Sequence, residues 1–106
     1  MSMFTLDSLA NLIASRARAP VDQSYTRSLL DAGIVKASKK FGEEAVEFVI
    51  AAVEKDKLAM KTEAADVLYH LLVVLQAGGV SLHDVVKELE RRTAVSGVEE
   101  KASRKE

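Results

Sequence analysis

Apolar residues recur at three- and four-residue intervals through most of the chain, which is the spacing of one face of an α-helix. In residues 5–18 the pattern includes Leu6 and Ile13, and Thr5 stands where an N-cap would be. Pro20, the only proline, follows this segment. Because proline interrupts helices, the pattern predicts a first helix over about 5–18 and a connection after it.

A short and then a long helical segment follow this connection. Ser24 can cap the short one, which ends at Gly33. From Ile34 to Glu54 the apolar residues again recur at helical intervals. Lys55 and Asp56 interrupt the pattern and provide a turn, with Asp56 as the N-cap of the next helix.

The helix after Asp56 is predicted to continue to Ala77, because Gly78 and Gly79 stop the pattern there. Residues 81–84, SLHD, resemble a capping box and predict a last helix that reaches about Arg92. No segment shows the two-residue alternation of a strand. The sequence therefore predicts an all-α fold, a helical bundle of four to five helices.

The size of the chain favours one domain spanning residues 1–106, with a charged tail over about 98–106. Its 106 residues are 48% hydrophobic and 29% charged. A chain of this size buries only roughly 60–70% of its unfolded surface. We therefore expect the bundle to be completed by dimerisation, as a homodimer.

Charge and residue content exclude several classes of protein. A net charge of −1 and a pI near 6.1 give no broad basic field for nucleic acid. There is no cysteine, which excludes disulfides and thiolate metal sites. No apolar run approaches the roughly 20 residues needed to span a bilayer, and the N-terminus lacks the pattern of an export signal. The sequence favours a cytoplasmic protein that binds neither nucleic acid nor a membrane.

The long central helix carries three glutamates among apolar side chains. Glu43, Glu44 and Glu47 share a narrow arc with Lys36 and Lys40. Like charges one turn apart are unfavourable in a helix. The arc is therefore either an ordinary solvated face or a surface that binds a cation.

Two acidic residues in the next helix favour the cation. Glu63 and Asp66 are also one turn apart, beside the apolar segment 64–75. Unpaired carboxylates are costly in such surroundings. Two antiparallel helices would bring Glu44 and Glu47 opposite Glu63 and Asp66, as a four-carboxylate site. Oxygen ligands of this kind suit Mg²⁺ or Mn²⁺, and Mg²⁺ retains waters that phosphate oxygens can replace.

These motifs resemble a known family. FGEEAVEFVIAAV (41–53) and EAADVLYHLLVVL (63–75) are similar to the signature of the all-α nucleoside triphosphate pyrophosphohydrolase superfamily. Within it, the chain most resembles the phosphoribosyl-ATP pyrophosphatase family of histidine biosynthesis. The further motifs that carry this resemblance are SYTRSLLDAG (24–33), KASKKFGEEAVE (36–47), GVSLHDVVKELERR (79–92) and SGVEEKASR (96–104).

The resemblance implies hydrolysis of phosphoribosyl-ATP between the α and β phosphates, with Mg²⁺ as cofactor, to give phosphoribosyl-AMP and pyrophosphate. Many members are fused to the cyclohydrolase of the next step, which uses cysteines for its metal. This cysteine-free chain resembles the stand-alone form, so a separate cyclohydrolase is expected. Two alternatives are a nucleotide-pool pyrophosphohydrolase of the same superfamily and a non-enzymatic helical interaction module.

The resemblance also assigns site residues. Glu44, Glu47, Glu63 and Asp66 match the metal-binding positions. Glu43, with Glu44 and Glu47, belongs to the catalytic set, as a ligand, as a general base or, as we favour, as support for a lysine. Basic and polar side chains are expected to bind the substrate: Lys36, Lys39, Lys40, Tyr25, Thr26, Arg27, Lys101, Ser103 and Arg104.

Two neighbouring residues on the second long helix have alternative interpretations. His70 lies one turn beyond Asp66, so it is either a base or metal ligand or a core residue hydrogen-bonded to Asp66. We favour the core residue. Tyr69 is interpreted as a core or dimer contact.

Overall fold

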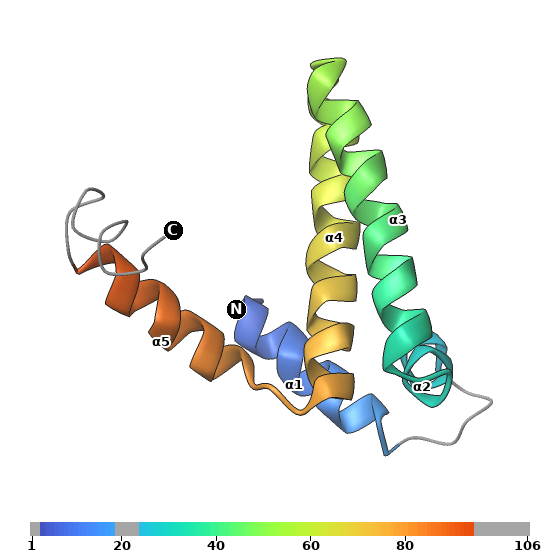
Figure 1. The fold of residues 1–106 in the computed structure, drawn as a ribbon, viewed down its shortest axis with the longest axis vertical. Coiled ribbons are helices and arrows are strands. Elements are labelled where there is room, and N and C mark those ends of the chain that lie inside the picture. Colours follow the sequence, from blue (N-terminus) through green and yellow to red (C-terminus); the bar gives the residue numbers. More distant parts are fainter. Residues whose placement is uncertain (1–2, 19–23, 95–106) are drawn as a thin grey trace.

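The computed structural model describes residues 3–18 and 24–94, and all regular structure in these ranges is helical (Figure 1). The predicted all-α class is therefore confirmed. Helices α3 and α4 form a long antiparallel hairpin, while α1 and α2 pack at its base and α5 extends away from it. The five helices are α1 Leu6–Arg16, α2 Tyr25–Asp31, α3 Ile34–Val53, α4 Lys57–Gly78 and α5 Leu82–Thr93.

Side-chain caps begin four of these helices where the sequence placed them. Thr5 and Ser8 form a reciprocal capping box at α1. Ser24, Asp56 and Ser81 each accept a hydrogen bond from the backbone N–H three residues later. Each cap satisfies a backbone donor that the first turn would leave unpaired. The ends of the helices agree with the predicted bounds to within two residues.

A tight turn makes α3 and α4 antiparallel. The N–H of Asp56 donates to the carbonyl of Ala51 at 3.2 Å, and that of Lys55 donates to Ala52 at 3.1 Å. Lys55 has a φ of 58°, a left-handed conformation of the kind that commonly ends a helix. The turn therefore sets the two long helices side by side, as the predicted carboxylate site requires (Figure 1).

The buried core lies at the base of the hairpin. Ile13, Ala37, Leu72 and Val73 form it, and side chains of α1 and α2 pack around them. The apolar segment 64–75 is not buried on every side in the single chain, since Leu68 remains 41% exposed. The reason is geometric, because the other helices contact only part of the circumference of α4.

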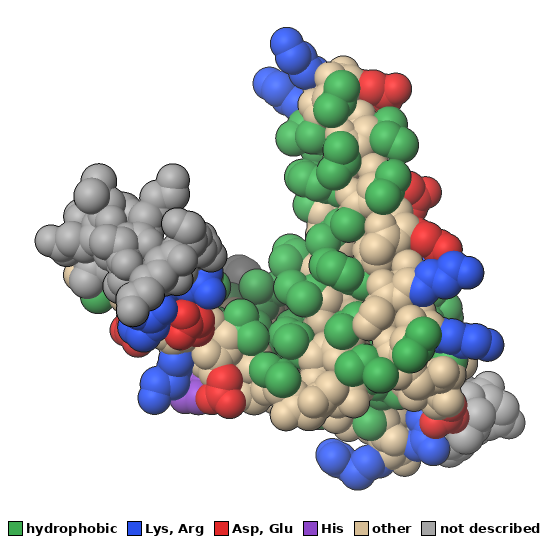
Figure 2. Space-filling model, in the orientation of Figure 1, with side chains coloured by type: hydrophobic (Ala, Val, Ile, Leu, Met, Phe, Trp, Pro, Cys, Tyr) green, Lys and Arg blue, Asp and Glu red, His purple; other side chains and the backbone are tan. Residues whose placement is uncertain are grey.

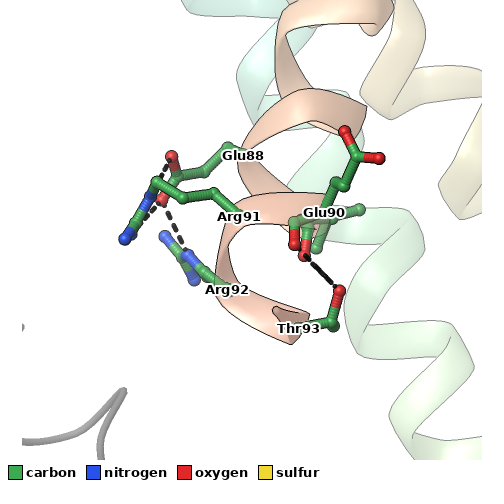
Figure 3. Close-up of polar contacts among 6 residues, drawn as sticks. Glu88, Glu90, Arg91, Arg92 and Thr93 are labelled. Atoms are coloured by element: carbon green, nitrogen blue, oxygen red, sulfur yellow. Dashed lines mark hydrogen bonds and ion pairs between the residues drawn. The ribbon is translucent and has the colours of Figure 1, made fainter. Parts of the chain in front are cut away.

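Helix α5 follows α4 at an angle of 110°. Its last turns carry a cluster in which Glu88 accepts hydrogen bonds from Arg91 at 3.0 and 2.8 Å and from Arg92 at 3.0 Å (Figure 3). These two guanidinium groups lower the pKa of Glu88 from its ordinary 4.5 to about 2. Among the described residues, no single helix has the length and apolar character of a membrane span, and only α4 and α5 taken together pass that test.

Candidate metal centre

Three carboxylates meet between α3 and α4. Glu44 comes from α3, while Glu63 and Asp66 come from successive turns of α4. One carboxylate oxygen from each lies within 4.8 Å of the other two. Glu44 is only 7% exposed, and the other two residues are half-buried. The antiparallel hairpin therefore brings together three of the four acidic residues that the sequence predicted to bind metal.

The donor set fits a hard divalent cation. Oε2 of Glu63 is buried and has no hydrogen-bond partner in the part of the chain that the structure describes. A buried carboxylate oxygen without a donor is costly unless a cation neutralises it. Three carboxylates offer only oxygen ligands, which suit Mg²⁺ or Mn²⁺ better than zinc.

Glu47 lies at the edge of this cluster. Its side chain is exposed, and it does not belong to the group of oxygens within 4.8 Å. A hydrogen bond between its carboxyl group and that of Glu44, with the charges of Glu44 and Glu63, raises the pKa of Glu47. The same hydrogen bond, followed by Lys40, lowers the pKa of Glu44 against the effect of burial. The pair therefore shifts in opposite directions, with the pKa of Glu47 raised and that of Glu44 lowered.

A lysine also neutralises the cluster from α3. Nζ of Lys40 lies 3.3 Å from Oε1 of Glu44. This hydrogen-bonded ion pair raises the pKa of Lys40, and the charge of Glu43 contributes to the same shift. Glu43 itself is exposed. The supporting role of Glu43 toward this lysine stays a prediction.

Helix α2 contributes an aromatic side chain near this lysine. Tyr25 is 57% exposed, and after the ion pair with Glu44 it makes a smaller contribution to the raised pKa of Lys40. Thr26 is buried, and its hydroxyl is hydrogen-bonded to that of Tyr69 on α4. Arg27 donates to Asp31 at 2.9 Å and to the carbonyl of Ala17. Of the predicted SYTR group, Tyr25 therefore presents its side chain to solvent, while its two neighbours attach α2 to the rest of the protein.

His70 and Tyr69 connect the centre to α2. Nδ1 of His70 lies 2.7 Å from the backbone oxygen of Asp66, and the side chain is buried. The favoured interpretation of His70 as a hydrogen-bonded core residue agrees with this, although its partner is the carbonyl and not the carboxylate of Asp66. Tyr69 was not recognised as part of the site. The available signal was its hydroxyl, which needs a partner in an apolar helix.

The remaining predicted residues are not brought into the cluster. Lys36 and Lys39 are exposed on the first turns of α3. Lys101, Ser103 and Arg104 lie outside the described residues. Their assignment to the substrate stays a prediction.

Comparison with known proteins identifies the family. A family model described as phosphoribosyl-ATP pyrophosphohydrolase matches residues 6–93. A Methylobacterium radiotolerans protein named phosphoribosyl-ATP pyrophosphatase is 59% identical over 99% of this chain and 98% of its own. Phosphoribosyl-ATP pyrophosphatase 1 of Bradyrhizobium diazoefficiens is 56% identical over the full length of both. These matches also exclude the non-enzymatic alternative, and the chain belongs to the phosphoribosyl-ATP pyrophosphohydrolase family of hydrolases.

Proposed function

We propose that this chain catalyses the Mg²⁺-dependent hydrolysis of phosphoribosyl-ATP to phosphoribosyl-AMP and pyrophosphate, the second step of histidine biosynthesis. The observation that carries the proposal is the cluster of Glu44, Glu63 and Asp66 in a chain of this family. Such a site serves a substrate whose reacting group is a polyphosphate. The names of the relatives supply the identity of that substrate.

In this proposal Glu44, Glu63 and Asp66 bind Mg²⁺, or Mn²⁺ in its place. Glu47, at the edge of the cluster, would supply a fourth ligand. When bound, the metal supplies positive charge to the phosphate oxygens and lowers the pKa of a coordinated water. The oxygen of a water then bonds to phosphorus, the bridging P–O bond between the α and β phosphates breaks, and pyrophosphate leaves.

The substrate binds on the side of the cluster where Lys40 and Tyr25 lie. A cation between the carboxylates competes with Lys40 for Glu44, which makes the ammonium group available to a phosphate oxygen. Glu43 holds Lys40 in place. Lys36 and Lys39 extend the positive charge along α3, Thr26 and Arg27 fix α2, and Lys101, Ser103 and Arg104 complete the phosphate and ribose contacts.

The exposed apolar surface favours a homodimer. Figure 2 shows hydrophobic side chains along the length of the α3–α4 hairpin. On α3, Val46, Val49 and Val53 are 59, 56 and 76% exposed, and Leu58 of α4 is 69% exposed. Contiguous apolar surface of this kind usually marks an interface. A second copy, packed against the hairpin, would complete the bundle.

The wider setting follows from the same function. We propose that residues 1–106 form one domain, which acts in the cytoplasm on a small nucleotide. Because phosphoribosyl-AMP is then released, a separate cyclohydrolase takes the next step. Neither nucleic acid nor a membrane is needed.

The products of the reaction test this proposal. The purified chain is incubated with Mg²⁺ and phosphoribosyl-ATP, or with ATP or deoxynucleoside triphosphates, and the phosphorus species are resolved by ³¹P NMR. We expect pyrophosphate and phosphoribosyl-AMP, with no turnover by the Asp66→Asn variant. Inertness toward phosphoribosyl-ATP together with hydrolysis of a common triphosphate would instead establish a nucleotide-pool function.

A further inference from the structure

One nitrogen beside the carboxylate cluster has no role in the reaction described so far. Nδ1 of His70 lies 2.7 Å from a carbonyl oxygen, which carries no hydrogen, so Nδ1 must be the donor. In the neutral ring Nε2 is then an acceptor. This atom is buried and has no hydrogen-bond partner among the described residues, although the side chain as a whole is only 5% exposed.

The ring of His70 is held on several sides. Tyr69 packs edge-on against it with ring centres 5.0 Å apart, and Tyr25 does so at 6.4 Å. The two tyrosines stack on each other at 6.3 Å, and the hydroxyl of Tyr69 is bonded to that of Thr26. With Nδ1 on the carbonyl of Asp66 as well, the ring is fixed by both α2 and α4. Such packing suits a side chain whose acceptor atom must keep one position.

His70 is close to the metal centre without belonging to it. Its Nδ1 is hydrogen-bonded to the backbone oxygen of Asp66, one of the three residues of the centre. Yet neither ring nitrogen belongs to the group of ligand atoms within 4.8 Å of one another. A fourth ligand would have to join that group. Mg²⁺ and Mn²⁺ both retain coordinated waters, and such a water can connect a ring nitrogen to an ion that the ring does not bind directly.

We propose that His70 is a positioning residue of this centre, and that its Nε2 accepts a hydrogen bond from a water molecule bound to the metal ion. The inference rests on the proposed function, since it requires a divalent ion between Glu44, Glu63 and Asp66. In this arrangement Nε2 of His70 is a fixed acceptor that orients one coordinated water. Tyr69 and Tyr25 serve the same purpose through the ring.

Two substitutions test the roles of the two ring nitrogens of His70 separately. In His70→Asn the amide N–H can still donate to the carbonyl of Asp66, but no acceptor remains at the position of Nε2. In His70→Gln the amide oxygen reaches that position. His83, an exposed histidine on α5, provides the matched control His83→Gln. Circular dichroism and thermal melting without metal verify that each variant is folded.

The binding of Mn²⁺ alone is measured by titration calorimetry. We expect the Kd of His70→Asn to be roughly 10- to 100-fold above that of the wild type, with a smaller change in His70→Gln and none in His83→Gln. Unchanged binding by a folded His70→Asn variant would overturn the inference. The Asp66→Asn variant distinguishes a failure of this inference from a failure of the proposed metal centre. Wild-type-like Mn²⁺ binding by that variant would refute the metal centre itself.

Electron spin-echo spectroscopy of Mn²⁺ in the wild-type protein needs no variant. A water-mediated contact predicts no strong ¹⁴N coupling from a directly bound imidazole. Strong coupling of that kind would show that His70 is a ligand, and would overturn the proposal even if His70→Asn did not fold.

Discussion

Replacing Asp66 by asparagine should make the metal-free protein more stable and abolish its stabilisation by metal. The substitution removes a negative charge from the cluster with little change of volume. Asp66 faces two other carboxylates, with oxygens no more than 4.8 Å away. Since its backbone oxygen is unchanged, the hydrogen bond from His70 is retained.

The magnitude follows from these distances. Two full charges 4.8 Å apart repel by about 3 kcal/mol at an effective dielectric constant of 20. The ion pair of Lys40 with Glu44 and the solvent around half-buried Asp66 both reduce this repulsion. We therefore expect the metal-free variant to gain about 1 kcal/mol, or a rise in Tm of roughly 4–8 °C.

Bound metal should reverse the order of stability of the wild type and the Asp66→Asn variant. At 100 times its Kd, a bound ion stabilises the folded wild type by about 2.7 kcal/mol. The variant gains little, so the wild type becomes the more stable protein by roughly 2 kcal/mol. The assay is thermal unfolding followed by circular dichroism in chelator and across a Mg²⁺ or Mn²⁺ titration, at one protein concentration so that association does not contribute.

Glu90→Gln is the control for the loss of one negative charge, because Glu90 is exposed on α5 (Figure 3), whereas the carboxylate cluster lies on α3 and α4. Its Tm should change little without metal and should rise with metal as the wild type's does. The reasoning is refuted if Asp66→Asn lowers the Tm of the metal-free protein. It is equally refuted if the wild-type Tm does not respond to millimolar metal.

Four further predictions concern the substrate side, the interface and pH. Lys40→Ala should lower kcat/KM for phosphoribosyl-ATP roughly ten- to hundredfold, mainly through KM, because it removes a charge-assisted phosphate contact. Deleting residues 101–106 should also raise KM. Unchanged steady-state constants would show that these residues do not bind the substrate. Val49→Lys should convert the proposed homodimer to monomer in sedimentation equilibrium, whereas Ser38→Lys, at an exposed polar position, should not. Because the lowered pKa of Glu88 makes its ion pairs stabilising above pH 4.5, Glu88→Gln should lower the Tm there, and the difference should close as the pH falls to about 2. A difference independent of pH would contradict that assignment.

The sequence by itself determined the helices and their ends. Thr5, Ser24, Asp56 and Ser81 cap helices in the structure because capping is local, and depends on a side chain and a backbone N–H three residues away. The pairing of Glu63 with Asp66 on one face follows from the helical repeat alone. These features were therefore predictable without a fold.

Only the tertiary structure decided which acidic residues meet. Glu44 and Glu47 are equivalent by spacing, yet Glu44 is buried with Glu63 and Asp66, while Glu47 remains exposed at the edge. The spacing along a helix fixes a face but not the register of that helix against its neighbour. That register depends on the turn at Lys55 and on packing at the base of the hairpin.

The same limit applies to the polar contacts around His70. Neither the bond between Thr26 and Tyr69 nor the stacking of Tyr25 on Tyr69 follows from helical periodicity, because the partners lie on different helices. These residues meet only when α2 packs against α4. Local sequence specifies which side chains need a hydrogen-bond partner, whereas the packing of the helices determines the partner that each one finds.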